Sequence, residues 1–322
     1  MRWLTIGVAV VAALWSAWWF VGSAAFERGA VAGIEAARAR GWEILYDDLS
    51  VTGFPNRFDT HVAAPRVTTP DGRASWSAPF LQVFALAYRP NRLIAVAPEA
   101  MAFELPVGRV DVTSGDLRAS AAFTASTSPE LERAAAAGQA LGVAGAGLDA
   151  TVGAAQLALR RADGEASVYD VALGVSDVRP ARALRAAIDP FETLPASVDA
   201  LDVDLTAALD RPLGPGGAPE IRAIELREAR LAWGDLRVTA RGAVAVDDAG
   251  VPEGSVAIEV EGWQAALRVA ASTGLVPAER LPLLTAGLAG MADDDGRLAL
   301  DLVLEDGGMR LGPIPIGPAP TL

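Results

Sequence analysis

Residues 235–263, DLRVTARGAVAVDDAGVPEGSVAIEVEGW, contain two runs in which apolar and polar side chains alternate. The apolar positions are Leu236, Val238 and Ala240 in the first run and Val256, Ile258 and Val260 in the second. Residues 247–250 separate the runs and have the composition of a turn. Because the side chains of a β-strand point alternately to its two faces, this stretch predicts a hairpin with one apolar and one polar face.

The same period of two recurs along most of the chain after Tyr46. It is clear in residues 168–175 and in residues 298–304, and it returns with a slip of one position in residues 198–205. The heptapeptide GDLRASA at 115–121 is matched by GDLRVTA at 234–240, which hints at two similar halves. We therefore expect a mainly β (α+β) protein built on a large antiparallel sheet.

Several segments are typical of helices instead. Residues 26–41 are rich in alanine and arginine and end at Gly41, so we expect a linking helix within 26–45. Residues 128–141, SPELERAAAAGQAL, start with a capping-box serine and are rich in alanine. A short helix is expected around Leu184, and two more are expected in 263–290, separated by Gly274 and Pro277.

The N-terminal segment predicts a membrane anchor. Residues 3–21, WLTIGVAVVAALWSAWWFV, are uncharged and would form about 28 Å of helix, close to the roughly 30 Å of a hydrocarbon core. The aromatic residues expected at the membrane interfaces are Trp3, Trp15, Trp18, Trp19 and Phe20. Since Arg2 precedes this span and the first acid, Glu27, follows it, the amino end is expected in the cytoplasm.

A cleaved signal peptide is the alternative, because Ser23, Ala24 and Ala25 are small residues suited to a cleavage site. Both interpretations export the rest of the chain. The apolar run is longer than a usual signal-peptide core, which favours a retained anchor at 1–25. In a bacterium, residues 46–322 would then form a periplasmic domain tethered to the inner membrane by a single span.

Composition excludes several function classes. All 27 basic residues are arginine, so lysine Schiff bases and P-loop lysines are excluded, and the absence of cysteine excludes thiolate chemistry. The net charge is −13, and residues 126–322 hold 16 arginines against 29 acids. Such an acidic surface repels phosphate backbones, so nucleic acid is not expected as a partner.

No pattern predicts catalysis or cofactor binding. The chain lacks G-x-S-x-G, G-x-G-x-x-G and P-loop motifs, and His61 is its single histidine. His61 lies two positions from Asp59, which fits a solvated strand face better than a triad. The acidic cluster at 293–296 resembles a turn and lacks the ligand spacing of a calcium loop. We therefore expect neither an enzyme, a metal site nor a cofactor.

Residues 49–67, LSVTGFPNRFDTHVAAPRV, alternate like a strand but contain Gly53-Phe54-Pro55. Because Pro55 has no amide to donate, this tripeptide predicts a strand start, an edge or a bulge. Phe58 and Val62 would then share the apolar side of the strand that follows.

These features together resemble an uncharacterised alphaproteobacterial family, domain-of-unknown-function family 2125. The resemblance rests on the exported N-terminal helix, on GFP with Arg57 and Asp59, on the GDLR strand, on Trp263 after Glu261-Gly262, and on the terminal GPIPIGPAP. The family is distantly similar to AsmA-like envelope proteins. That similarity implies an inner-membrane anchor, a curved sheet with an apolar concave face, and a role in moving lipid.

An apolar groove of this kind predicts phospholipid or another acyl-chain lipid as the partner. Its candidate lining residues are Phe58, Val62, Val256, Ile258, Leu298, Leu300, Leu302 and Leu304. The alternative is a closed core, covered by the helices expected at 128–141 and 263–290, in a scaffold module that binds another envelope protein.

Overall fold

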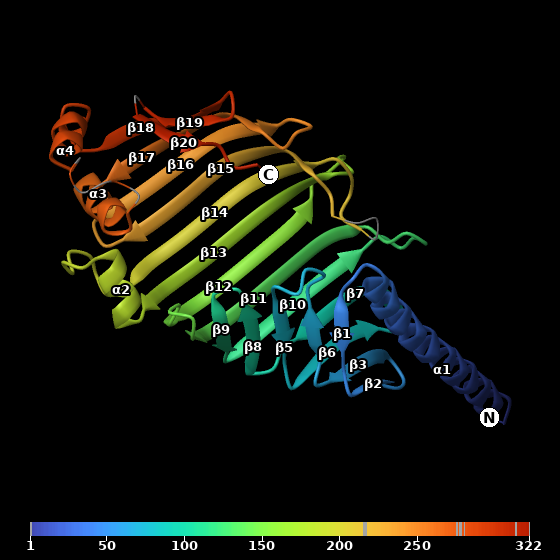
Figure 1. The fold of residues 1–322 in the computed structure, drawn as a ribbon. Helices are drawn as coiled ribbons and strands as arrows, with labels where there is room; N and C mark the ends of the chain where they lie inside the picture. The colour runs from blue at the N-terminus through green and yellow to red at the C-terminus, as the bar shows by residue number, and fades with distance from the viewer. Residues whose placement is uncertain are drawn as a thin grey trace.

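The computed structural model describes residues 2–214, 218–274, 276, 279, 281–312 and 314–321. Within these ranges the strands join into one large antiparallel sheet flanked by four helices, which confirms the predicted fold class. Figure 1 shows the sheet as a curved surface. Helix α1 projects from one side of it, and helices α2, α3 and α4 lie at the other side (Figure 1).

Helix α1 (Arg2–Ala39) is continuous, so the predicted linking helix extends the predicted membrane span. The helix ends where Gly41 adopts a φ of 92°, a conformation that glycine reaches without a steric penalty. The Gly41 amide donates a hydrogen bond to the carbonyl of Arg38 at 2.9 Å, and the chain then enters the sheet.

The first ten strands are five long strands that are each interrupted once. Their bounds are β1 (Glu43–Leu45), β2 (Asp48–Thr52), β3 (Arg57–Ala63), β4 (Arg66–Thr68), β5 (Ser75–Ser77), β6 (Phe80–Leu86), β7 (Arg89–Val96), β8 (Ala100–Leu105), β9 (Gly108–Thr113) and β10 (Asp116–Phe123). The halves form two series of antiparallel pairs that lie side by side. One series is β2–β3–β6–β7–β10, and the other is β1–β4–β5–β8–β9. The interruptions therefore form a fold line across the sheet.

Prolines create much of this fold line. Pro65, Pro79 and Pro98 lie between the two halves of three of the long strands, where they cannot donate a ladder hydrogen bond. The backbone still pairs around them, because the Ala64 amide donates to Pro79 O at 2.8 Å and the Ala78 amide donates to Pro65 O at 3.2 Å. The sheet is interrupted here without separating.

The remaining strands continue as a meander, in which each pairs with the next. Their bounds are β11 (Leu131–Ala144), β12 (Ala150–Arg161), β13 (Val168–Pro180), β14 (Val198–Leu209), β15 (Ile221–Trp233), β16 (Leu236–Val246), β17 (Pro252–Glu261), β18 (Leu298–Glu305), β19 (Gly308–Leu311) and β20 (Ile314–Pro318). The predicted hairpin is confirmed, with Val238 opposite Val260 and Ala240 opposite Ile258. The slip predicted in 198–205 does not interrupt the pairing of β13 with β14, whose register is the same on both sides of Asp199.

The helix predicted at 128–141 is wrong, because β11 occupies most of that segment. β11 pairs with β10 and β9 on one side and with β12 on the other. Alanine favours a helix by only about half a kcal/mol per residue over most residues, and two full ladders of hydrogen bonds outweigh that preference here. Small side chains suit this position, since residue Gly138 lies against Leu117 and Leu141.

Helices α2 (Arg182–Ile188), α3 (Trp263–Ser272) and α4 (Leu281–Ala289) confirm the short helices predicted near Leu184 and in 263–290. Pro277, which was expected to separate the last two, lies outside the described residues. A hydrophobic cluster forms beside α3, and its buried members are Leu194, Trp233, Leu236, Val260, Trp263, Leu298 and Leu300. The Trp233 indole donates to Pro195 O at 2.8 Å, which satisfies its polar atom.

Candidate functional site

One face of the sheet carries an uninterrupted row of uncharged residues. In an antiparallel pair, directly opposite residues point to the same face, so the register traces a row from strand to strand. This central row consists of Val51, Thr60, Val83, Ala95, Ala119, Ala136, Leu157, Leu173, Val203, Ala229, Ala240, Ile258 and Leu300. Thr60 supplies the only side-chain polar atom in it. We call this side of the sheet the apolar face.

The opposite face, called the polar face, has a different character. The adjacent row on it consists of Ser50, His61, Gln82, Val96, Arg118, Ala137, Gln156, Gly174, Asp202, Arg230, Thr239, Glu259 and Ala299. Of these two rows, only the one on the polar face carries charged and amide side chains. The separation of the two faces is maintained over more than ten strands.

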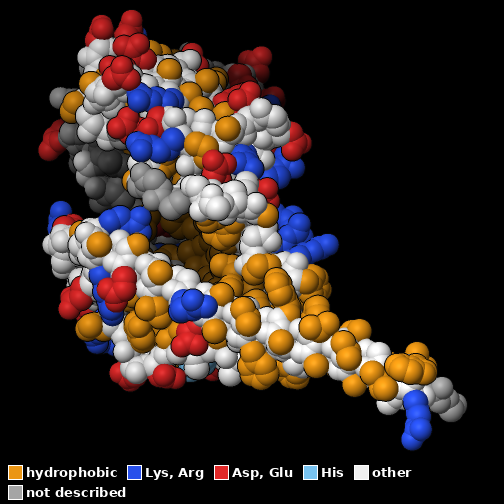
Figure 2. All heavy atoms as spheres, turned by 90° about the vertical axis from the view of Figure 1, so that its right-hand side faces the viewer, with side chains coloured by type: hydrophobic (Ala, Val, Ile, Leu, Met, Phe, Trp, Pro, Cys, Tyr) orange, Lys and Arg blue, Asp and Glu red, His pale blue; other side chains and the backbone are white. Residues whose placement is uncertain are grey.

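The middle of the apolar face is not covered by a second layer. Between Ala95 and Ala240 no residue of the central row is buried, and Leu157 is 46% exposed. Figure 2 shows a hollow whose visible walls are hydrophobic, and the apolar helix leaves the molecule beside it. Because soluble surfaces rarely leave long apolar stretches uncovered, this hollow is the candidate binding site.

The two ends of the apolar face are covered. At the β3 end, Phe58 is 3% exposed and its ring lies 5.3 Å from that of Phe26 in α1. At the β18 end, Leu298 is 3% exposed and belongs to the cluster beside α3. The open part of the face therefore lies on β7 and β10–β16.

This arrangement places the predicted groove residues in two groups. Phe58, Leu298, Leu300 and Leu304 are buried, so they pack against protein and do not line the open part. Val62, Val256, Ile258 and Leu302 are half-buried on the edges of the apolar face. Sequence reasoning missed the open centre at Leu157, Leu173 and Val203, although period-two patterning in their strands was the signal that could have found them.

The predicted interfacial aromatics all lie on α1, which is long and apolar enough to cross a membrane. Trp3, Trp18 and Phe20 are 86%, 59% and 63% exposed. Trp15 is partly exposed, and its indole donates to Pro55 O at 3.0 Å. Trp19 is buried, and its indole donates to Arg57 O at 2.8 Å. The GFP motif is thus the turn between β2 and β3, docked against α1.

The polar candidates from the sequence have structural partners. His61 lies on the polar face with its ring stacked 6.0 Å from Phe80, while Asp59 pairs with Arg57 at 2.7 Å. Asp293 accepts hydrogen bonds from the amides of Asp295 and Arg297, which forms the predicted turn before β18. Within the described part of the chain, no group of histidine and acidic residues is arranged to hold a metal ion.

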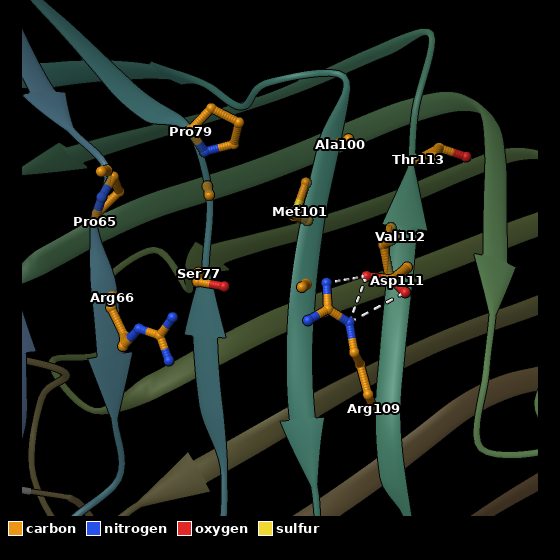
Figure 3. Close-up of a pocket in the computed structure, with 13 residues that line it drawn as sticks. Pro65, Arg66, Ser77, Pro79, Ala100, Met101, Arg109, Asp111, Val112 and Thr113 are labelled. Atoms are coloured by element: carbon orange, nitrogen blue, oxygen red, sulfur yellow. Dashed lines mark hydrogen bonds and ion pairs between the residues drawn. The ribbon is translucent and has the colours of Figure 1, made fainter.

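A shallow cleft of about 390 Å³ lies beside the fold line (Figure 3). Its charged lining residues, Arg66, Arg109 and Asp111, belong to the polar face of β4 and β9. Hydrogen bonds from the Arg109 guanidinium lower the pKa of Asp111 and hold the pair together (Figure 3). Because Arg109 is already neutralised, the cleft offers less to an anionic ligand than its composition indicates.

A cluster of ion pairs links strands β12 to β15 on the polar face. Arg227 contacts Asp170 at 2.8 Å and also binds Asp204, while Arg160 contacts Asp170 at 3.0 Å. Hydrogen bonds from Arg227 and then Arg160 lower the pKa of Asp170 to about 2. The cluster is an interstrand clamp, and it lies on the opposite side of the sheet from the hollow.

Comparison with known families supports the resemblance found in the sequence. The model of a family described as "Uncharacterized protein conserved in bacteria (DUF2125)" matches residues 19–320, which include the whole described sheet and, of the interfacial aromatics, Trp19 and Phe20. No curated protein and no solved structure gives a significant match. The more distant similarity to AsmA-like proteins and an alphaproteobacterial origin stay predictions.

Proposed function

The chain belongs to the uncharacterised bacterial family DUF2125, and we propose that it is a membrane-anchored envelope protein that binds lipid on its apolar face and helps to transfer it. In this proposal α1 is a single pass through the bacterial inner membrane, and the sheet lies in the periplasm. The role is not enzymatic and involves no cofactor.

The observation that carries the proposal is the uncovered centre of the apolar face, where Leu157, Leu173 and Val203 lie side by side. An acyl chain gains about 0.8 kcal/mol for each methylene removed from water, so full exposure of a 16-carbon chain to water would cost on the order of 12 kcal/mol. Passage from a bilayer to the hollow exchanges one apolar environment for another. Transfer then needs little net free energy.

A lipid comparison between matched variants tests the proposal. Leu157→Asp places a charge on the apolar face, and Ala158→Asp places the same charge on the polar face of the same strand. Full-length wild type and both variants would be purified identically, and the co-purifying phospholipid would be quantified by mass spectrometry. Lipid around α1 is common to all three proteins and cancels in the comparison.

We expect Leu157→Asp to lose bound phospholipid and Ala158→Asp to retain it, with circular dichroism showing that both variants are folded. Equal lipid content in all three proteins would contradict binding on the apolar face. The function to test next would then be the scaffold role, with another envelope protein binding the acidic surface of residues 126–322.

A further inference from the structure

We infer that the turn between β2 and β3, residues 53–56, is a second membrane contact that enters the lipid interface beside α1. The partner it fits is the surface of a phospholipid bilayer. This inference rests on the proposed placement of α1 in the membrane and adds an orientation for the sheet.

The turn is fixed to the apolar part of α1. Trp15 and Trp19 donate their indole hydrogen bonds to the carbonyls of Pro55 and Arg57. The Phe54 ring lies 5.4 Å from the ring of Trp19 and 5.9 Å from that of Phe20. All of these helix residues belong to the uncharged span of residues 3–21.

The position along α1 sets the depth of the turn. Trp15 lies six residues before Val21, the last residue of the predicted membrane span, which corresponds to about 9 Å of helix. Interfacial segments typically lie about 5–10 Å into the boundary between headgroups and acyl chains. If α1 spans the bilayer, the turn therefore lies within that boundary.

Several backbone carbonyls of the turn are hydrogen-bonded within the protein, which suits a layer with little water. Backbone polar groups must be satisfied internally at membrane depth, because water is scarce there. Pro55 has no amide hydrogen, and its carbonyl is bonded to Trp15. The carbonyls of Gly53 and Asn56 accept from the amides of Arg57 and Ala87 at 3.0 Å and 2.9 Å.

The exposed side chains at this edge suit the interface. Phe54 is 53% exposed, and at the neighbouring connection between β6 and β7, Leu86 (the last residue of β6) and Tyr88 are 38% and 61% exposed. These exposed side chains are not part of the buried core. Tyrosine and other aromatic residues are favoured at the level of the lipid headgroups. The hollow opens beside α1 in Figure 2. Membrane contact at both turns would therefore keep the hollow next to the bilayer.

Site-specific fluorescence quenching tests the contact, and the chain has no cysteine to complicate labelling. Full-length Asn56→Cys, Tyr88→Cys and Arg73→Cys variants would each carry one fluorophore in vesicles of phosphatidylethanolamine and phosphatidylglycerol. The lipids would include a fraction brominated near the headgroup. Arg73 is the matched control, because its turn lies next to Gly41 beyond the far end of α1, about 36 Å along the helix from Trp15.

We expect strong quenching at positions 56 and 88 and little at position 73. Phe54→Ser should reduce quenching at position 88 by about twofold or more while α1 stays inserted. Equal quenching at all three positions, or no effect of Phe54→Ser, would overturn the inference. Quenching at positions 56 and 88 in a protein that binds no lipid on its apolar face would refute the proposed function but not this contact. Lipid bound on the apolar face without quenching at positions 56 and 88 would refute this contact but not the proposed function.

Discussion

The indole nitrogen of Trp19 donates a hydrogen bond to the backbone carbonyl of Arg57 at 2.8 Å, which joins the apolar helix to the first hairpin of the sheet. Trp19 is 5% exposed and packs with Phe58, Ala85 and Ala87 in a small hydrophobic cluster. The helix is therefore part of the folded structure as well as an apolar span. Orientation of the sheet follows from orientation of the helix.

Removing this contact should destabilise the protein. Trp19→Ala loses buried aromatic packing and a hydrogen bond, so we expect the free energy of unfolding to fall by about 3–5 kcal/mol. Trp19→Phe keeps a ring but loses the donor and should cost about 1–2 kcal/mol. Urea unfolding in detergent micelles measures both. Trp18→Ala, at a 59% exposed position, is the control, and a cost equal to that of Trp19→Ala would contradict the assignment.

Two glycine-to-alanine substitutions should change the free energy of unfolding in opposite directions. A Cβ at Gly242 in β16 would lie 2.2 Å from Ser255 O and 2.6 Å from Val256 Cα, so Gly242→Ala must push β16 and β17 apart. We expect a loss of about 1–3 kcal/mol. Gly287 in α4 has no neighbour within 4 Å of such a Cβ, and Gly287→Ala should gain about 0.5–1 kcal/mol from helix propensity. Thermal unfolding should show a lower melting temperature for Gly242→Ala and a higher one for Gly287→Ala than for the wild type.

The Asp170 clamp predicts acid sensitivity. The pKa of Asp170 is lowered from 3.8 to about 2 in the folded protein, so its contribution to stability is complete above the unfolded pKa. That contribution is lost as the pH falls from about 4 to about 2. Since the side chain is 25% exposed, we expect on the order of 1 kcal/mol.

Asp170→Asn provides the measurement for this clamp. The variant should be less stable than wild type at pH 7 and should lose less stability between about pH 4 and pH 2. Urea unfolding at several pH values compares the two proteins. An identical acid dependence in both would show that Asp170 does not titrate as its contacts indicate.

Much of the sheet could be predicted from period-two patterning. The hairpin at 235–263 has the predicted faces, because arginine, threonine and glutamate occupy several of its polar positions and leucine, valine and isoleucine occupy most of its apolar positions. β11 was not predicted, because Arg133 to Ala137 reads as a helix when alanine occupies both faces. Helix propensity is a local property, whereas the pairing of β11 with β10 and β12 is a property of the whole sheet.

The sequence predicted an apolar sheet face but did not locate its uncovered centre. Leu298 and Leu300 belong to a clearly alternating strand, yet they are buried members of the cluster beside α3. The exposed centre includes Ala119, Ala136 and Ala229, whose small side chains give a weak hydrophobic signal. Identifying it requires the register between neighbouring strands, which periodicity within one strand does not provide. The docking of the β2–β3 turn on α1 likewise depends on contacts about 40 residues apart in sequence.

Photo-crosslinking in native membranes tests the central claim most directly. A photoreactive leucine analogue would replace Leu173 on the apolar face or Ala172 on the polar face of β13, in the full-length chain. After irradiation, mass spectrometry of the purified protein would detect adducts with the mass of membrane lipids. The account predicts lipid adducts at position 173 and none at position 172. Adducts at neither position, or equal yields at both, would contradict lipid binding in the hollow.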